Sequence, residues 1–384
     1  MKTKQTIGII GGGPGGLTLA RILAVRGISA QLFELDEHPL ARPQGGTLDL
    51  HQESGLKALR LAGLQDAFDA VARYEDQEMR LYDGRGALRM EHSGSVDRGR
   101  PEIDRTQLRA LLLDSLPAAS ISWGCKVRSV AVQPNGRVRI EGALGSLGDF
   151  DWVVGADGTW SVVRPLLSPH RPVYSGVTFI ELAIDDVDRR HPAIARMVGH
   201  GKASILVRDG LGLIAQRNSH AHIRVYLSLR VPEGWIDQGH IDLSSGAKAK
   251  TDLRRLLAGC HDSVLALIDQ ANDHIVARPL VALPVGHRYP HRRGLTLLGD
   301  AAHVMSPFGG EGVNLAMQDA AELACALADS EDWDSAVEQY EHAMFDRAEP
   351  AAAGAAQGLQ LFSGDGAMER VTTFCACHPA PPQG

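Results

Sequence analysis

Several features that mark particular protein classes are scarce in this chain or absent from it. A formal net charge of −7 over 384 residues provides no basic surface for nucleic acid. No apolar run approaches the roughly 20 residues of a membrane-spanning helix, and the run at Ile7–Ile10 is too short for a signal peptide. The few cysteines are odd in number and scattered, at Cys125, Cys260, Cys325, Cys375 and Cys377. We therefore expect a cytoplasmic protein without a disulfide framework, a membrane span or a nucleic-acid partner.

Repeats and metal-ligand patterns are also missing. The sequence has no internal repeat, and its one low-complexity segment is Ala351–Ala356. Cys375, Cys377 and His378 form a C-x-C-H pattern in a proline-rich tail, but no second ligand pair accompanies it, so we predict no metal site. The length exceeds what one hydrophobic core usually supports, and 44% hydrophobic and 22% charged residues are ordinary globular values. We expect a globular protein of two domains.

What the chain does have is glycine beside predicted helix starts. The most informative stretch, Gly299–Ala320, reads GDAAHVMSPFGGEGVNLAMQDA. It follows Leu295–Leu298, which reads as a buried strand, and leads into Val313–Leu327, whose periodicity predicts a helix. Glycines at this position let a ligand approach bare backbone amides at the positive end of the helix dipole. Taken alone, the segment also fits a strand–loop–helix turn without a ligand.

The start of the chain carries a second glycine-rich turn. Ile7–Ile10 reads as a short strand, and Leu17–Val25 continues as a helix. Between them the sequence fits G-x-G-x-x-G, with Gly11, Gly13 and Gly16 in the three glycine positions. The next predicted strand, Ala30–Glu34, ends in an acidic residue at the spacing suited to ribose hydroxyls. The pattern favours FAD or NAD over NADP as the tightly held cofactor, because an acidic residue there selects a free 2′-hydroxyl.

A third element separates FAD from NAD. Asp151–Ala156 reads as another buried strand and is followed by Asp157, Gly158 and the run TWSVVR. Three glycine-linked turns far apart in the chain fit one long cofactor bound by a discontinuous domain. An ordinary NAD dehydrogenase fits less well, because its binding half is normally contiguous.

At this point the chain can be compared with a known family. The ordered motifs GGGPGG, Glu34, Arg42, GADGTWSVVR and GDAAHVMSPFGGEGVN resemble the group A flavoprotein monooxygenases, the aromatic-hydroxylase type. Two further runs, ARPQGGTLDLH at Ala41–His51 and RPEIDRTQLRALLLDSL at Arg100–Leu116, resemble the tetracycline-inactivating monooxygenases within that group. Those enzymes diverge at the GADG motif, which is intact here. The resemblance runs from about Thr6 to the 340s.

The resemblance implies an α/β fold: a discontinuous Rossmann-like FAD-binding domain, an antiparallel-sheet substrate domain and a long C-terminal bridging helix. We expect the FAD domain at 1–172 and 284–330, with a substrate-domain element inserted around Arg73–Arg100. The substrate domain, 173–283, shows strand-like runs at 178–184, 204–207, 211–216, 223–229 and 275–283, interrupted by one helix at about 251–270. A helix with Pro350 kinking it is expected at 331–365, and a loose tail at 366–384.

The resemblance also implies the chemistry. NADPH docks transiently and reduces FAD, and dioxygen then forms a flavin C4a-hydroperoxide that transfers oxygen to an electron-rich carbon of a phenol or enol. The protein supplies position, electrostatics and exclusion of water. No acid–base dyad is required, and none is evident in the sequence. A second G-x-G-x-x-G is also lacking, which fits a family without a separate nicotinamide domain.

Cofactor roles follow from the matched motifs. The ADP half of FAD is assigned to Gly11, Gly13, Pro14, Gly15, Gly16 and Glu34. Arg42 is assigned to the flavin side, Arg105 to the ribityl or phosphate region and Asp300 to the ribityl chain. Asp157 and Gly158 belong to a motif associated with both FAD and NADPH. The flavin edge and its reduced pyrimidine ring are assigned to Pro307, Gly310, Gly312 and Val313.

Several residues carry a simpler interpretation beside a functional one. Arg109 follows Arg105 by four residues and reads as a surface helix residue. His303 reads as a buried histidine hydrogen-bonded to backbone under the flavin loop, rather than as a catalytic group. Met305, Phe308 and Met317 read as core side chains.

The substrate is the least determined part of the prediction. In the tetracycline subgroup a glutamine, an arginine and a histidine on the roof sheet contact the substrate, and Glu181, Ala203 and Arg224 stand at those places here. None is retained, and loss of such partners costs about 1–3 kcal/mol each. Arg224, or Arg208 and Arg217 nearby, is a candidate partner for an acidic substrate group, while Glu181 argues against a purely carboxylate substrate. The predicted substrate pocket consists of Glu181, Arg224, Phe308 and Gly309.

Three functions stay open. The first is an FAD-, NADPH- and O2-dependent monooxygenase of tetracycline-like polyketides, with antibiotic inactivation as its outcome. The second is the same chemistry on another phenolic or enolic compound. The third is a flavin-binding protein that sequesters or senses a ligand and turns over poorly.

Overall fold

The chain folds into two compact units. The computed structural model describes residues 5–41, 45–74, 78–92 and 100–377. Unit 1 comprises Met1–Ala72, Arg105–Val173 and Val281–Ala356; unit 2 comprises Arg73–Asp104, Tyr174–Leu280 and Gln357–Gly384. Each unit is therefore assembled from segments far apart in the sequence.

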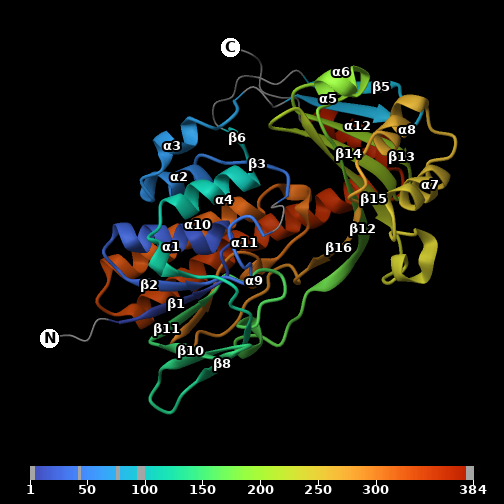
Figure 1. Ribbon diagram of the computed structural model, residues 1–384. Coiled ribbons are helices and arrows are strands. Elements are labelled where there is room, and N and C mark those ends of the chain that lie inside the picture. The colour runs from blue at the N-terminus through green and yellow to red at the C-terminus, as the bar shows by residue number, and fades with distance from the viewer. Residues whose placement is uncertain (1–4, 42–44, 75–77, 93–99, 378–384) are drawn as a thin grey trace. The chain divides into compact units, whose positions relative to one another are not determined.

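Unit 1 is built on a parallel sheet of five strands in the order β17-β11-β1-β2-β7 (Figure 1). Its strands are β1 (Ile7–Ile10), β2 (Ala30–Phe33), β7 (Ile121–Ser122), β11 (Trp152–Gly155) and β17 (Leu295–Leu297). A second sheet, β10-β9-β8, is antiparallel and comprises β8 (Val127–Val132), β9 (Val138–Gly142) and β10 (Gly145–Phe150). The unit also holds the short strand β3 (Thr47–Asp49). The predicted strands at 7–10, 30–34, 151–156 and 295–298 are thus confirmed, with ends that differ by one residue at most.

Unit 1 also contains helices, and two of them, α1 and α10, approach each other closely at a glycine. The helices include α1 (Pro14–Val25), α2 (Gly55–Leu61), α3 (Gln65–Asp69), α4 (Arg105–Asp114), α9 (Asp300–His303) and α10 (Gly312–Asp329). A Cβ on Gly15 of α1 would lie 2.7 Å from Leu298 Cδ1 and 3.0 Å from the Ala316 carbonyl oxygen of α10. The glycine therefore permits a helix approach that any larger residue would prevent.

Unit 2 is built on a sheet of seven strands in the order β16-β12-β15-β14-β13-β4-β5 (Figure 1). Its long strands are β12 (Val173–Ile184), β13 (Lys202–Arg208), β14 (Leu211–Asn218), β15 (His222–Arg230) and β16 (Val276–Ala282). The shorter strands of the sheet are β4 (Met79–Asp83) and β5 (Leu88–His92), and the unit also holds β6 (Glu102–Asp104) outside this sheet. The pairs β12–β15, β15–β14, β14–β13 and β4–β5 are antiparallel, and β13 pairs with β4 in parallel. The sheet places residues 79–92 beside strands that follow more than one hundred residues later.

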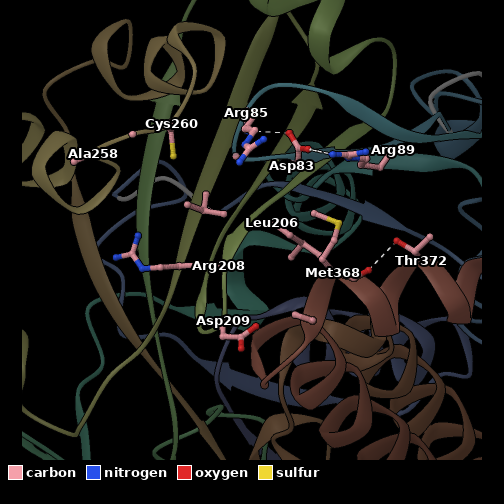
Figure 2. Close-up of a pocket in the computed structure, with 14 residues that line it drawn as sticks. Asp83, Arg85, Arg89, Leu206, Arg208, Asp209, Ala258, Cys260, Met368 and Thr372 are labelled. Carbon is pink, nitrogen blue, oxygen red and sulfur yellow. Dashed lines mark hydrogen bonds and ion pairs between the residues drawn. The ribbon is translucent and has the colours of Figure 1, made fainter.

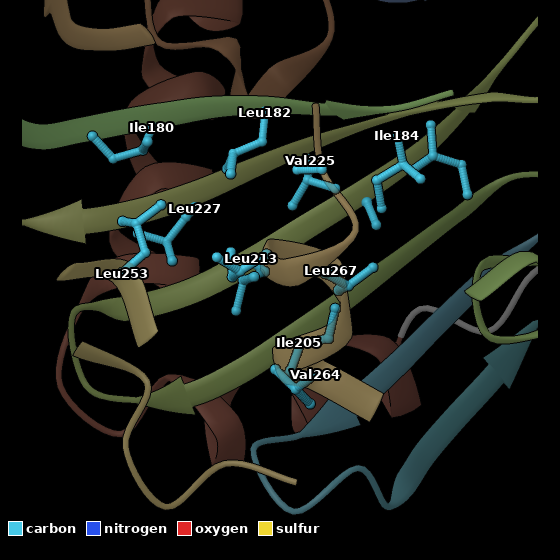
Figure 3. Close-up of a cluster of buried hydrophobic side chains, with 14 of the residues drawn as sticks. Ile180, Leu182, Ile184, Ile205, Leu213, Val225, Leu227, Leu253, Val264 and Leu267 are labelled. Carbon is cyan, nitrogen blue, oxygen red and sulfur yellow. The ribbon is translucent and has the colours of Figure 1, made fainter. Parts of the chain in front are cut away.

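One face of this sheet is a hydrophobic core (Figure 3). Strand residues alternate, so that Ile180, Leu182, Val225 and Leu227 point into the core and their neighbours point to the other face. The core face is covered by α5 (Val187–Arg190), α6 (Pro192–Val198), α7 (Gly246–Leu256) and α8 (Asp262–Asp269). Figure 3 shows Leu253, Val264 and Leu267 of the last two helices against the strands.

The single helix predicted at 251–270 is two helices. Helix α7 ends at Leu256 and α8 begins at Asp262. Gly259 adopts φ of +88°, a left-handed conformation that ends a helix, and His261 Nδ1 accepts a hydrogen bond from Ser263 N at 3.2 Å to cap the next one. Apolar periodicity continues across the break, which is why the sequence reads as one helix.

The C-terminal region is helical further than expected. Helix α11 (Trp333–Ser363) contains Pro350 and continues past it. The boundary between the two units falls within α11, after Ala356. A loose tail is expected from residue 366, whereas Ala367–Cys377 form α12, whose first residue is buried. His378 and the prolines beyond it lie outside the described residues.

Two findings concern classes of site. Within the described ranges, no helix combines the length and apolar character needed to cross a membrane. No group of three or more potential metal ligands occurs among those same residues.

Candidate functional site

The carboxyl ends of four parallel strands bring the three glycine motifs together in unit 1. Ile10 pairs with both Phe33 and Gly155, and Gly155 pairs with Leu297, so the strands end in register. Backbone hydrogen bonds continue one step further, from Gly11 N to Phe33 O at 2.9 Å and from Leu298 N to Gly155 O at 3.0 Å. The loops after β1, β2, β11 and β17 therefore leave one edge of the sheet, where ligands bind in open α/β sheets.

Glycines of the first loop perform two different tasks. A Cβ on Gly11 would lie 2.3 Å from the Ala156 carbonyl oxygen, and one on Gly16 would lie 2.0 Å from the Gly11 oxygen. A Cβ on Gly13 would have no atom within 4 Å. Gly11 and Gly16 are therefore required by packing, whereas Gly13 leaves open space in front of the helix. An open backbone at this position fits a pyrophosphate.

Helix α1 presents free amides to that space. Gly13 is its N-cap, Pro14 is its first residue, and no described side chain caps the end. Proline suits the first helical position because it has no N–H to satisfy. The remaining amides and the helix dipole favour an anionic ligand, as the predicted role of Pro14, Gly15 and Gly16 requires.

Glu34 is buried at the end of β2 and already holds the loop. Its Oε2 accepts a hydrogen bond from Gly12 N at 2.5 Å, and its Oε1 accepts one from Asp36 N at 2.9 Å. The carboxylate thus fixes the glycine turn from the neighbouring strand. Its predicted contact with the ribose stays a prediction.

Arg109 is not a surface residue, contrary to the expectation. Its side chain is 3% exposed, and its guanidinium donates to the carbonyl oxygens of Gly12 and Pro39 and forms an ion pair of 3.1 Å with Asp36. It therefore ties the glycine loop to the segment after β2. The four-residue spacing from Arg105 predicts that Arg109 lies on the outward face of α4. The side chain is buried instead, because carbonyl oxygens of distant segments and Asp36 satisfy its charge.

Arg105 opens α4 and offers a donor without a partner. Its Nε is buried and has no hydrogen-bond partner among the described residues. Its side chain lies next to Gly45, since a Cβ there would be 3.5 Å from Arg105 Cδ. A buried unpaired donor costs free energy, so its presence fits a cofactor contact. Arg42, the other arginine predicted for the cofactor, lies outside the described residues.

Asp157 and Gly158 follow β11 as predicted. Asp157 Oδ2 accepts a hydrogen bond from Val162 N at 2.7 Å, whereas its buried Oδ1 has no partner within the described ranges. Burial raises the pKa of Asp157, and its hydrogen bonds and the charge of Arg164 counteract this only in part. Gly158 has a φ of +76°, and a Cβ there would meet nothing within 4 Å.

Arg164 links the GADG motif that follows β11 to the glycine-rich motif that follows β17, a role that is not predicted from the sequence. The side chain is buried, and it donates to the carbonyl oxygens of Ala301 at 3.0 Å and Thr159 at 2.6 Å. Its partners are backbone atoms, and a pattern of residue types in the sequence does not predict such partners. The arginine fixes the distance between the loops that follow β11 and β17.

The third motif forms an exposed loop between two helix starts. Asp300 begins α9 with an exposed side chain, and Pro307, Gly309 and Gly310 are exposed as well. Gly310 takes the left-handed conformation at φ of +69°. Phe308 is half-buried, so the structure places only Met317 of the expected core residues fully inside.

Helix α10 begins at Gly312 and points its amides at this loop. Glu311 is the N-cap and makes no side-chain cap hydrogen bond. A Cβ on Gly312 would lie 3.9 Å from Asp300 Oδ1, which places the helix start beside the exposed carboxylate. Val313 is 7% exposed, so its side chain belongs to the core rather than to the open edge.

His303 is buried as predicted, but its partner is a carboxylate. Its Nε2 lies 2.7 Å from Oδ2 of Asp319, which is fully buried and also accepts from Gly299 N at 3.0 Å and from Arg347 at 2.8 Å. Burial alone would lower the pKa of His303, but the carboxylate outweighs it and the pKa is raised. Burial would likewise raise the pKa of Asp319, and the two cations lower it instead. The pair anchors the loop after β17 to α10.

Asn314 anchors the same helix to the GGTLDLH run. It is fully buried, its Oδ1 accepts from His51 N at 2.9 Å, and its Nδ2 donates to Asp49 O at 2.9 Å. The predicted motifs that resemble the family are therefore held to one another by buried side-chain to backbone hydrogen bonds.

These observations fit FAD. A Cβ on Gly13 or Gly158 would meet no protein atom within 4 Å, one on Gly312 would meet only Asp300 Oδ1 at 3.9 Å, and two helix ends lack a side-chain cap. Arg105 Nε and Asp157 Oδ1 are buried polar atoms that the described protein leaves unpaired. Together they provide backbone amides, a cation and hydrogen-bond groups along one edge, as an anionic, hydroxyl-bearing dinucleotide requires.

In unit 2, the sheet face opposite the core carries a charge cluster. Arg278 Nε lies 2.6 Å from Glu181 Oε1, and Arg224 Nη1 lies 3.9 Å from Glu181 Oε2. Phe179 and Tyr226 pack at 5.7 Å between ring centroids on the same two strands, β12 and β15. The cluster has two cations and one anion, so Glu181 does not present an isolated negative charge.

The other candidate positions of unit 2 are placed differently from expectation. Ala203 is fully buried in the hydrophobic core and faces away from Glu181 and Arg224, because the expected register is shifted by one residue. Arg217 is engaged with Asp188 at 2.5 Å and with the Gly199 carbonyl oxygen. Arg208 lines a separate cavity of the same unit. Only Arg224 of the three candidate arginines stands beside Glu181.

The fold and the open edge define a flavoprotein with a discontinuous dinucleotide-binding unit. The chain matches the family model described as "FAD binding domain" over residues 4–354 and belongs to this family. Among its relatives, it is 34% identical to "Monooxygenase penA" of Penicillium thymicola, over 83% of each chain. It is 28% identical to "3-amino-4-hydroxybenzoate 2-monooxygenase" of Streptomyces cremeus, over 87% of this chain and 82% of the relative. The protein is an FAD-dependent monooxygenase of the aromatic or natural-product type.

Solved structures share the fold. Klebsiella pneumoniae HpxO complexed with FAD and uric acid has a TM-score of 0.81 at 21% identity, covering 97% of this chain and 92% of that one. Tetracycline destructase Tet(55) has a TM-score of 0.73 at 20% identity, covering 100% of this chain and 99% of that one. The predicted fold class is confirmed.

Proposed function

We propose that the protein uses FAD, NADPH and dioxygen to hydroxylate a phenolic or enolic natural product. The observation that carries this proposal is the open edge in unit 1, where three cofactor motifs end at neighbouring strands and Gly13 faces no protein atom. When bound and reduced, the flavin supplies the redox chemistry that activates dioxygen. The residues of the chain supply position and electrostatics.

Each anchored loop has a part in that task. Gly13 and the start of α1 bind the pyrophosphate, and Arg105 contacts the phosphate or ribityl region through its unpaired Nε. Asp300, exposed at the start of α9, accepts a hydrogen bond from a ribityl hydroxyl. The free amides at the start of α10 stabilise negative charge on the reduced pyrimidine ring.

The charged face of unit 2 indicates the kind of substrate. Arg224 and Arg278 share one carboxylate, Glu181, so the cluster keeps a net positive charge. A phenolate or enolate oxygen complements such a cluster, and the Phe179–Tyr226 pair suits a planar ring. We expect an ionisable aromatic or enolic substrate to bind this face, and not a neutral aliphatic one.

Tetracycline is the named candidate with specific support. The support consists of the GGTLDLH and PEIDRTQLR runs and of the fold shared with Tet(55). The same chemistry on another phenolic compound is the alternative, and the relative that acts on 3-amino-4-hydroxybenzoate favours it. The cluster of Glu181, Arg224 and Arg278 differs from the glutamine, arginine and histidine of the tetracycline subgroup, which also favours the alternative.

The decisive experiment is aerobic NADPH oxidation by the FAD-loaded protein, with and without tetracycline. Tetracycline absorbance, product mass and hydrogen peroxide are followed together, with ¹⁸O2 in a parallel reaction. Stimulated oxidation with a product heavier by one labelled oxygen atom is expected for tetracycline as substrate. Stimulated oxidation that yields only hydrogen peroxide identifies a ligand that is bound but not hydroxylated.

A panel of phenols and enols follows if tetracycline is unchanged. Hydroxylation of one panel member supports the alternative substrate class. Tight binding across the panel without any labelled product would overturn the enzymatic proposal and favour a protein that sequesters its ligand. NADH in place of NADPH, at equal concentration, measures the preference for the nicotinamide.

A further inference from the structure

Unit 2 contains a cavity that takes no part in the flavin site or the charged sheet face. Its volume is about 760 Å³, within the range of small-molecule pockets. It is lined by the β4–β5 turn, the end of β13, the loop before α8 and the start of α12 (Figure 2). All of its lining residues belong to unit 2.

The floor of this cavity is apolar. Leu206 and Ala367 are buried in a small hydrophobic cluster that also includes Leu81, and Met368 packs against it. Figure 2 shows Leu206 and Met368 on one side of the cavity, and Cys260, Arg85 and Arg208 on the other. An apolar floor beside a polar wall suits an amphipathic ligand.

The acidic side chains at the cavity are already engaged. Asp83 accepts hydrogen bonds from Arg85 N and Ala87 N and forms an ion pair with Arg89. Asp209 accepts from Gly366 N at 2.9 Å. The two carboxylates at the cavity therefore stabilise the β4–β5 turn and the start of α12.

The cations are less engaged. Arg85 donates through its backbone to Asp83, but its guanidinium has no partner among the described residues. Arg208 donates from Nη1 to the Leu256 carbonyl oxygen at 3.1 Å and makes no ion pair within the described ranges. Burial raises the pKa of the Cys260 thiol, so this neighbour adds no negative charge at neutral pH. Net positive charge faces the cavity.

We propose that this cavity is a second ligand site, which binds a small amphipathic organic anion. Its carboxylate or sulfonate pairs with Arg85 and Arg208, and its aromatic or aliphatic part lies over Leu206 and Met368. The site is independent of the flavin and of the monooxygenase reaction. A bound ligand joins β13 to α12 and stabilises unit 2.

The test uses the full-length, FAD-loaded protein and two matched dyes. The probe 8-anilinonaphthalene-1-sulfonate carries the anion, and N-phenyl-1-naphthylamine has the same rings without it. The dissociation constant of the anionic dye is expected to rise about fivefold in Arg85→Gln and in Arg208→Gln, and more in the double variant. The neutral dye is expected to bind all variants equally, which also reports that the cavity is intact. Arg196→Gln, an exposed arginine of unit 2 outside the cavity, is the control.

Cys260 provides a readout that needs no substitution. Saturating anionic dye is expected to slow alkylation of Cys260 by N-ethylmaleimide, measured by peptide mass spectrometry, and to leave Cys125 of unit 1 unchanged. Unprotected Cys260 in the wild-type protein would overturn the proposal. So would a double variant that binds the anionic dye as tightly as Arg196→Gln does.

Discussion

Among the described residues, a carboxylate in each unit meets two cations, and the surroundings of these two clusters differ. In unit 1, Asp319 is fully buried between His303 and Arg347. In unit 2, Glu181 is 16% exposed and its partner Arg278 is 62% exposed. The first cluster anchors loops at the cofactor edge, and the second lies on the sheet face opposite the hydrophobic core of unit 2. Similar chemistry thus serves architecture in one unit, and we propose that it serves substrate binding in the other.

The largest expected effect comes from removing the buried charge. Asp319→Asn leaves His303 without its counter-ion in the interior, and we expect it to lower the free energy of unfolding by about 3–5 kcal/mol. Urea unfolding followed by circular dichroism at fixed FAD concentration measures this. Glu322→Gln is the control, since the half-buried Glu322 pairs with the same Arg347, and about 1 kcal/mol or less is expected there.

The same variant has a pH signature. The raised pKa of His303 means that its ion pair stabilises the folded state at acidic pH and that this contribution is lost as pH rises through the folded pKa. In Asp319→Asn the strongest group that raises the pKa of His303 is gone, so the effect of burial dominates and protonation of His303 opposes folding. The stability difference between wild type and variant is therefore expected to be larger at pH 5.5 than at pH 8.5. An equal difference at both pH values would contradict an ionised pair.

The next effect separates the two kinds of glycine in the first loop. Gly16→Ala forces a Cβ to within 2.0 Å of the Gly11 carbonyl oxygen, so we expect about 2–3 kcal/mol of destabilisation even without FAD. Thermal and urea unfolding of the FAD-free protein measure this. A stable Gly16→Ala variant with normal FAD binding would show that the helix does not need the close approach.

Gly13→Ala is expected to act on the cofactor alone. Its Cβ meets no protein atom, so the stability of the FAD-free protein should change by only about 0.5 kcal/mol. Affinity for FAD should fall by about tenfold, because the methyl group occupies space proposed for the pyrophosphate. Titration of FAD fluorescence gives the dissociation constant. Unchanged affinity would mean that the pyrophosphate lies elsewhere.

The predictability of the two regions differs for a physical reason. The cofactor edge depends on backbone geometry, and only glycine satisfies positions such as Gly11, so the sequence must show it. The strands that precede the three glycine motifs can therefore be predicted from the sequence. By contrast, Arg109 and Arg164 act on backbone carbonyl oxygens of distant segments, and no local pattern reveals those partners.

The sheet face of unit 2 was harder to predict because side chains alternate. A shift of one residue moves a side chain to the other face, and Ala203, which we expect from the sequence beside Glu181 and Arg224, faces the core instead. Arg278, the closest partner of Glu181, lies on another strand 97 residues later. Pairings of this kind depend on strand order, which the sequence pattern of single strands does not contain.

The smallest expected effect is on the exposed cluster, and it distinguishes binding from architecture. Glu181→Gln has the same carboxylate-to-amide chemistry as Asp319→Asn, but solvent screens its closest partner, Arg278, so we expect about 1 kcal/mol or less of destabilisation. Removal of the anion raises the positive charge that Arg224 and Arg278 present. The KM for an ionised phenolic substrate should then fall by up to about fivefold, while the KM for its neutral methyl ether or ester should not change.

Salt and a second variant sharpen this last prediction. The fall in KM should weaken when the ionic strength is raised, because the charges are near solvent. Arg278→Gln should change KM in the opposite direction, since it removes a cation and leaves Glu181 with Arg224. If both variants lowered the free energy of unfolding by several kcal/mol and left KM unchanged, the cluster of unit 2 would be architectural like that of unit 1, and the substrate would be bound by other residues.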